Sequence, residues 1–131
     1  MNQIAENILS ILENGWNNAD GQHFAQPFAS TSQFVDIRGV LHANASPAQL
    51  GVAHQGIFDT IYKGSRVKYL PIQTVTLSDS SFLLNVAATL DAPIGPLMGT
   101  NHSVITMLIS KQENEWKILS FHNTLKAREG R

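Results

Sequence analysis

Apolar residues recur at three- and four-residue steps in the first part of the chain, which is typical of an amphipathic helix. The stripe comprises Ile4, Ile8, Ile11, Leu12 and Trp16. Asp20 is placed to cap a second, short helix, and Pro27 must end it because proline lacks a backbone donor and clashes with the preceding turn. A third helix is predicted to open at Ser46-Pro47, with serine as the cap, and to stop at Gly64.

From Ser65 onward the apolar period changes to two, which predicts β-strands. Residues 67–77 are expected to be extended, and Pro71 indicates an edge strand or a bulge there. The clearest alternation lies between residues 82 and 90. Further strands are predicted at 101–110 and 115–124, around a turn at 112–114, and one or two short strands precede Arg38-Gly39 at 28–37.

Three helices followed by a long antiparallel meander predict an α+β domain with the helices packed on one face of the sheet. Long strands twist and curl, so a curled sheet with helices across its mouth leaves a pocket. The chain has 131 residues, the usual size of a single domain, and we expect one domain over 1–131 with a frayed tail at 126–131.

The composition of the chain argues against several classes of function. The formal net charge is −1 and the nine basic residues are scattered, so no nucleic-acid or membrane-surface partner is expected. The N-terminal residues lack the order of a signal peptide and no apolar run is long enough to span a membrane, which predicts a cytoplasmic protein. Without cysteine, without a G-x-G-x-x-G fingerprint and without ligand-spaced histidines, the chain is expected to hold neither cofactor nor metal.

Several short motifs occur in the order found in a known superfamily. Trp16, Asp20 and Phe24 are followed by the segment 34–39, Phe-Val-Asp-Ile-Arg-Gly. The chain thereby resembles the nuclear transport factor 2-like superfamily, which includes SnoaL-like and ketosteroid-isomerase-like proteins. Segments 54–65 and 116–124 are similar, more narrowly, to its SgcJ/EcaC branch. The resemblance covers nearly the whole chain and implies a cone-shaped, cystatin-like roll of a highly curved antiparallel sheet and three helices, usually a homodimer.

Asp36 is the first candidate for catalysis. In ketosteroid-isomerase-like relatives an aspartate at about this place shuttles a proton, and Phe34 and Ile37 would give it an apolar setting that raises its pKa. The alternative is a structural carboxylate that pairs with Arg38 or caps a turn. No tyrosine lies on the first helix and no carboxylate lies between residues 100 and 112, so the usual isomerase partners are missing.

Three histidines are candidate partners of that carboxylate. His54 lies on the apolar stripe of the third helix and is either a pocket-lining acid or donor, or a neutral, hydrogen-bonded core residue. His102 and His122 lie on the last two strands. Strand parity separates His122 from Asn123, so only one of the two faces the pocket, and the sequence does not decide which.

Aromatic residues are expected to wall the pocket or to form the core: Trp16, Phe24, Phe28, Phe34, Phe58 and Tyr62. The loop at 92–100 is the expected lip, with two glycines for mobility and three apolar side chains, Ile94, Leu97 and Met98, that either cover a ligand or pack on a dimer partner. Two functions remain open. The first is cofactor-independent acid–base chemistry (isomerase, cyclase or dehydratase type) on a polycyclic or aromatic metabolite, with Asp36 as base and a histidine partner. The second is a non-catalytic ligand-binding or dimerisation module. Either predicts a homodimer through the outer face of the sheet.

Overall fold

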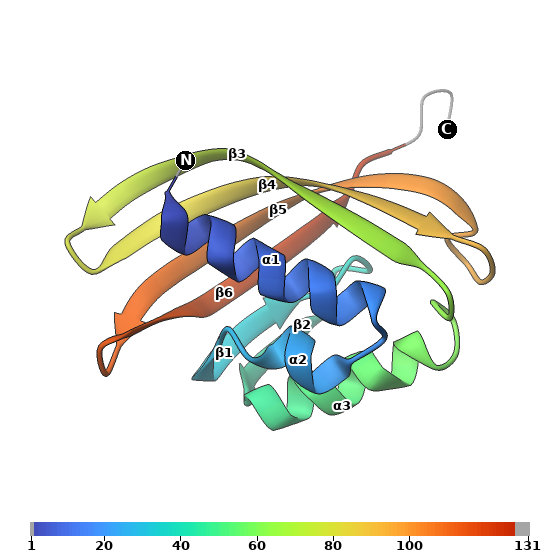
Figure 1. The fold of residues 1–131 in the computed structure, drawn as a ribbon, viewed down its shortest axis with the longest axis horizontal. Coiled ribbons are helices and arrows are strands. Elements are labelled where there is room, and N and C mark those ends of the chain that lie inside the picture. Colours follow the sequence, from blue (N-terminus) through green and yellow to red (C-terminus); the bar gives the residue numbers. More distant parts are fainter. Residues whose placement is uncertain (1, 128–131) are drawn as a thin grey trace.

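A computed structural model describes residues 2–127. A curved sheet of six strands arches over three helices (Figure 1). The elements are α1 (Gln3–Asn17), α2 (Gly21–Ala25), β1 (Phe28–Val35), β2 (Leu41–Ala45), α3 (Pro47–Phe58), β3 (Arg66–Ser78), β4 (Ser81–Ala92), β5 (Gly99–Gln112) and β6 (Glu115–Leu125). The predicted α+β class is confirmed, with the helices gathered on the concave side of the sheet.

The helices begin at side-chain caps, two of which the sequence predicts. Asp20 accepts from the backbone N–H of His23, and Ser46 with Gln49 forms a capping box at the start of α3. The predicted end of α3 at Gly64 is wrong, because the helix stops at Phe58 and residues 59–64 form turns. Gly64 instead takes a left-handed φ of 77° at the entry to β3.

The strand order is β2-β1-β6-β5-β4-β3, and four of the five pairings are antiparallel. The exception is β1, which runs parallel to β6. No hairpin sets the direction of β1 relative to β6, since α3 and the rest of the sheet separate them in the sequence. Strand β2 was not predicted, because four of its five residues are exposed and apolar alternation is absent.

Two irregularities bend the long strands. The pairing of β3 with β4 shifts between Pro71 and Gln73, on the strand at the edge of the sheet, which confirms the prediction for Pro71. The pairing of β5 with β6 shifts between Leu108 and Ile109, so that Leu119 is the extra residue of β6. Bulges of this kind increase strand bending and local twist, and the second one decides which side chains of β6 reach the pocket.

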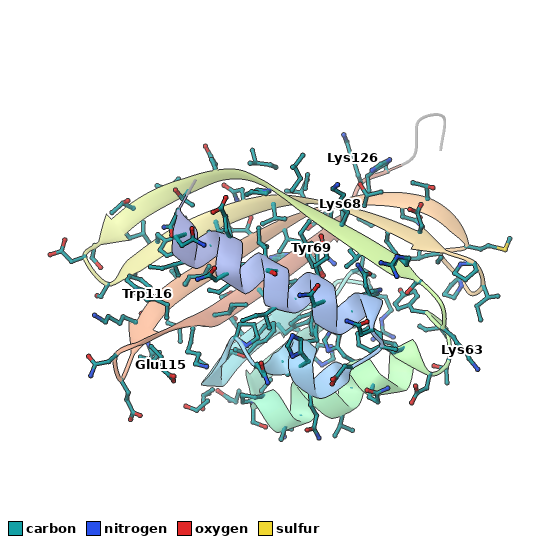
Figure 2. All side chains as sticks on the ribbon, viewed as in Figure 1. Lys63, Lys68, Tyr69, Glu115, Trp116 and Lys126 are labelled. Carbon is teal, nitrogen blue, oxygen red and sulfur yellow. The ribbon has the colours of Figure 1, made fainter. Side chains whose placement is uncertain are left out.

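The core lies between α1 and the concave face. Neighbouring side chains of β3 alternate: Tyr69 lies beneath α1 and is 8% exposed, whereas Lys68 points away from the helices (Figure 2). A Glu13 carboxylate oxygen accepts from the backbone N–H of Tyr69 at 2.9 Å and ties α1 to this edge strand. Gly15 lets α1 and α2 touch, because a Cβ there would collide with the backbone of Phe24.

The chain end of the described region stays attached to the sheet. Lys126, within the predicted tail, donates its backbone N–H to the carbonyl of His102 at 2.8 Å, and residues 128–131 of that tail lie outside the described residues. No helix in the described part of the chain combines the length and the apolar character needed to cross a membrane.

Candidate functional site

A pocket of about 340 Å³ opens at one end of the cone. Its walls come from the end of α1, the end of β1 and the loop after it, the second half of α3 and the turns after it, the loop between β4 and β5, and the end of β6. The lining residues are Trp16, Phe34, Asp36, Ile37, Arg38, His54, Ile57, Ile61, Tyr62, Pro96, Leu97, Asn123 and Leu125. The volume falls at the low end of the range of about 300–1,000 Å³ that is usual for ligand pockets, which favours a ligand of few rings.

Trp16 is fixed in the aromatic part of the wall. Its indole N–H donates to the hydroxyl of Ser65 at 3.0 Å, and that hydroxyl donates to the carbonyl of Tyr62 at 2.6 Å. The ring centroids of Trp16 and Tyr62 are 5.7 Å apart, and those of Trp16 and Phe58 are 4.9 Å apart. Burial raises the pKa of the Tyr62 hydroxyl, so it stays protonated at neutral pH.

His54 lies at the floor of the pocket and is 6% exposed. Its Nδ1 is 2.8 Å from the carbonyl oxygen of Leu50, so Nδ1 carries the proton and donates, and Nε2 is left as an acceptor. Phe24 stacks on the ring at 4.3 Å and Phe34 meets it edge-on at 5.2 Å. Burial among these rings lowers the pKa of His54 to about 4, despite the opposing bond to Leu50, so the imidazole is neutral at pH 7.

Asp36 lines the pocket, but its oxygens are turned into the loop that follows β1. Oδ1 accepts from the backbone N–H groups of Arg38 and Val40, at 2.9 and 3.2 Å. Oδ2 accepts from the Arg38 guanidinium at 2.9 Å and lies 3.0 Å from Nε2 of His42. Partial burial would raise the pKa of Asp36, but these hydrogen bonds outweigh it and hold the pKa well below its usual range.

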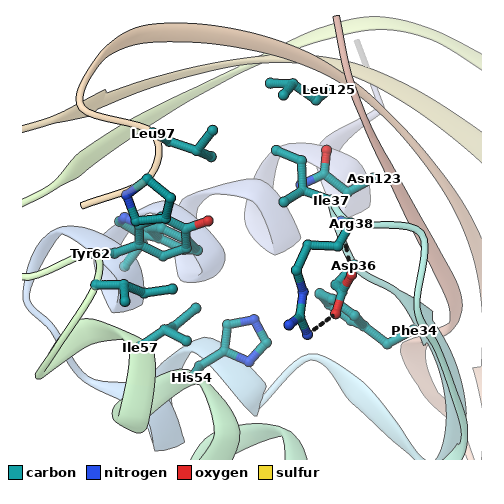
Figure 3. Close-up of a pocket in the computed structure, with 13 residues that line it drawn as sticks. Phe34, Asp36, Ile37, Arg38, His54, Ile57, Tyr62, Leu97, Asn123 and Leu125 are labelled. Atoms are coloured by element: carbon teal, nitrogen blue, oxygen red, sulfur yellow. Dashed lines mark hydrogen bonds and ion pairs between the residues drawn. The ribbon is translucent and has the colours of Figure 1, made fainter.

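This geometry corrects the expected chemistry of Asp36. Asp36 could act as a base near neutral pH only if an apolar setting raised its pKa. In the structure its hydrogen bonds lower that pKa instead. The structural alternative, a carboxylate that pairs with Arg38 and closes a turn, describes the contacts. Asp36 therefore organises the loop and holds the guanidinium of Arg38, whose side chain points back over the pocket toward His54 (Figure 3).

The bulge at Leu119 settles the ambiguity on β6. It reverses the parity along the strand, so Ile118 and Phe121 are both buried although they are three positions apart. Asn123 consequently lines the pocket, and His122 is exposed on the convex face. The expectation that only one of His122 and Asn123 faces the pocket agrees with this arrangement, because the extra residue lies before both of them.

His102 also lies outside the pocket, where it is exposed on the convex face near Thr89, with Nδ1 3.4 Å from the threonine hydroxyl. His102 and His122 therefore cannot act on anything bound in the pocket. Three predicted wall residues do not line it either. Phe24, Phe28 and Phe58 are at most 3% exposed and form the core behind it.

Three lining residues were not expected at the pocket: Ile57, Ile61 and Leu125. Ile37 and Arg38 were expected only as neighbours of Asp36. Most of these residues lie in loops or at the ends of elements, where periodicity carries no signal. The predicted lip between β4 and β5 contributes Pro96 and Leu97. It is pinned rather than loose, because Gly95, at a φ of 89°, packs on the carbonyl of Ile61, and the Asn101 amide donates to the carbonyl of Leu97 at 2.6 Å.

Asn123 carries an unusual polar atom. Its Oδ1 is buried and has no hydrogen-bond partner among the described residues. Buried polar atoms are nearly always paired, so an exception at a pocket wall is a candidate contact for a bound molecule. Within the described residues, no group of three histidine or acidic side chains is placed to hold a metal ion.

Comparisons with known proteins identify the fold. No family model matches the sequence, and no curated protein matches it with a significant score. An uncharacterized protein with a cystatin-like fold from Caulobacter vibrioides is similar to this chain with a TM-score of 0.84 and 23% identity, over 97% of this chain and 90% of the other. An NTF-2 like protein of unknown function from Shewanella oneidensis gives 0.77 and 17%, over 93% and 97%.

A ketosteroid isomerase-like protein from Erwinia carotovora atroseptica is similar with a TM-score of 0.76 and 11% identity, over 96% of each chain. The protein therefore has the cystatin-like, or nuclear transport factor 2-like, fold that the sequence predicts. At these sequence identities the comparisons establish the fold only. The function has to be argued from the residues of the pocket.

Proposed function

We propose that this protein binds a small, largely apolar molecule in the pocket at the open end of the cone. The observation that carries the proposal is the combination of an aromatic and aliphatic wall with a carboxylate that is already fully engaged. Trp16, Tyr62 and Leu97 offer apolar surface. Both carboxylate oxygens of Asp36 already accept hydrogen bonds from the loop after β1. Pockets of this composition bind ligands chiefly by apolar burial and use a few polar groups for orientation.

The alternative, acid–base chemistry on a polycyclic or aromatic metabolite, needs a group that accepts a proton near neutral pH. Asp36 is stabilised as the carboxylate by four hydrogen bonds, and the pKa of His54 is about 4. Both are weak bases at pH 7. We therefore place ligand binding first and acid–base chemistry second. The presence of a ketosteroid isomerase-like protein among the fold neighbours does not change this order.

The resemblance to the SgcJ/EcaC branch is part of this proposal and rests on the sequence motifs alone. A cytoplasmic location is proposed separately, from the sequence alone. We also propose a homodimer through the convex face of the sheet. Leu70, Ile72 and Val104 are 61%, 55% and 43% exposed there. Exposed apolar residues gathered on one face are typical of protein–protein interfaces.

An NMR titration with 2-naphthamide, a neutral two-ring probe, tests the binding proposal. About 13 non-hydrogen atoms at about 0.3 kcal/mol each give about 4 kcal/mol, or a Kd of about 1 mM. Leu97→Trp should fill the pocket and weaken binding at least about tenfold, because it occupies the space the probe needs. Met98→Trp is the matched control, since Met98 is 65% exposed in the same loop and does not line the pocket.

Saturable binding that L97W weakens and M98W leaves unchanged supports the proposal. Absence of saturable binding to the wild-type protein, or an equal effect of both variants, contradicts it.

A further inference from the structure

The two sides of the pocket differ in chemistry. Ile57, Tyr62 and Leu97 make one side apolar, while Arg38 and Asn123 lie on the opposite side (Figure 3). A flat molecule between them meets apolar surface on one face and polar groups along one edge. The position of those polar groups therefore defines what the edge of the ligand must carry.

Arg38 provides the permanent positive charge among the described residues that line the pocket. One guanidinium nitrogen donates to Asp36 at 2.9 Å, and among the described residues the other guanidinium N–H groups have no hydrogen-bond partner. The contact with Asp36 fixes the direction of the side chain, because the aspartate itself is held by the N–H groups of Arg38 and Val40. The guanidinium is thus oriented in advance and keeps free donors at the pocket.

Asn123 supplies an independent observation on the same side of the pocket. Its Oδ1 is buried without a partner among the described residues, and its amide lies beside Ile37 in the wall that carries Arg38 (Figure 3). An unsatisfied buried acceptor costs free energy in the empty protein, and a hydrogen-bond donor on a ligand would remove that cost. Arg38 therefore calls for an acceptor on the ligand and Asn123 for a separate donor, so the ligand has a polar edge and is not a hydrocarbon.

We propose that the ligand is a ring-containing carboxylic acid, bound with its rings against Tyr62 and Leu97 and its carboxylate at Arg38. This inference rests on the proposed function and names its ligand class. A guanidinium fork matches the planar geometry of a carboxylate. The guanidinium N–H groups that Asp36 leaves free suit one carboxylate, and the pocket volume of about 340 Å³ suits a ligand of one or two rings.

The test compares 2-naphthoate with 2-naphthamide, which have the same rings and size but differ in charge. In NMR titrations of the wild-type protein, 2-naphthoate should bind about fivefold more tightly at low salt, a modest factor because Arg38 is 73% exposed. The preference should shrink in about 0.5 M NaCl, where screening weakens exposed charge pairs.

Two variants test whether Arg38 causes the preference for 2-naphthoate over 2-naphthamide. Arg38→Met should abolish the preference, so that 2-naphthoate and 2-naphthamide bind this variant with equal affinity, and Arg38→Lys should keep part of the preference because the charge remains. If neither probe binds the wild-type protein, the proposed function fails and the inference with it. If both bind equally, the proposed function stands and the inference is overturned. A preference for 2-naphthoate that survives in R38M also overturns the inference. A wild-type preference that salt leaves unchanged overturns it as well, and that measurement does not depend on the folding of any variant.

Discussion

The buried imidazole of His54 makes the stability of the protein depend on pH in a way that can be calculated. Burial lowers its pKa from 6.5 to about 4 in the folded state. In the unfolded chain the ring is solvated and titrates near 6.5. Between these values the unfolded state binds more protons than the folded state, so stability is fully present above pH 6.5 and is lost as pH falls toward 4.

The size of the effect follows from the shift. At about 1.4 kcal/mol for each pKa unit, the full loss is about 3 kcal/mol, most of which has appeared at pH 4.5. His54→Gln keeps a hydrogen-bond donor near the Leu50 carbonyl but does not titrate. The difference in unfolding free energy between wild type and H54Q should therefore change by about 2 to 3 kcal/mol between pH 7.5 and 4.5.

Urea denaturation, followed by circular dichroism at both pH values, measures this difference. The other ionisable groups cancel between the two proteins. Asp36 affects the stability at lower pH than His54 does. Its pKa is lowered in the folded protein, so the stability that it contributes is lost only as pH falls below about 3.8. Parallel pH profiles for wild type and H54Q would refute the reasoning, since they would mean that the folded protein accommodates a charged His54.

Three further predictions concern other features. Asn123→Leu removes the buried, unpartnered oxygen and should raise the unfolding free energy by about 1 kcal/mol in urea melts; a loss of stability would show that the amide has a partner in solution. Gly95→Ala should lower it by about 2 kcal/mol, because φ is 89° and a Cβ would strike the carbonyl of Ile61; an unchanged midpoint would mean that the loop rearranges freely. Val104→Lys should convert the proposed dimer to a monomer in light scattering at micromolar concentration, because Val104 lies exposed on the convex face; a wild-type protein that is already monomeric would contradict the dimer.

Much of the fold could be predicted because local signals agreed with it. The α1 stripe, the caps at Asp20 and Ser46, and the alternation along β4 each correspond to an observed element. The features of the fold that the sequence did not predict depend on contacts between distant segments. The parallel pairing of β1 with β6 has no local signature, and β2 is held by its neighbour rather than by its own apolar residues.

The candidate site shows the same division. Trp16, Phe34 and Tyr62 were expected at the pocket from their residue type and lie there. Arg38 appeared in the sequence as a possible partner of Asp36, and its place at the pocket depends on the turn that the aspartate closes. Asn123 could not be distinguished from its neighbour, because the bulge that reverses the parity of β6 leaves no mark in the pattern of residues.

The central claim is that a small apolar molecule binds at the open end of the cone, and the two tryptophans allow a direct test of it. Trp16 lines this pocket, whereas Trp116 packs against Phe82 at the other end of the sheet. During titration with 2-naphthamide, the indole N–H signal of Trp16 should shift and saturate in the NMR spectrum while that of Trp116 stays in place. A Trp16 signal that does not move, or equal shifts of both signals, would contradict the account.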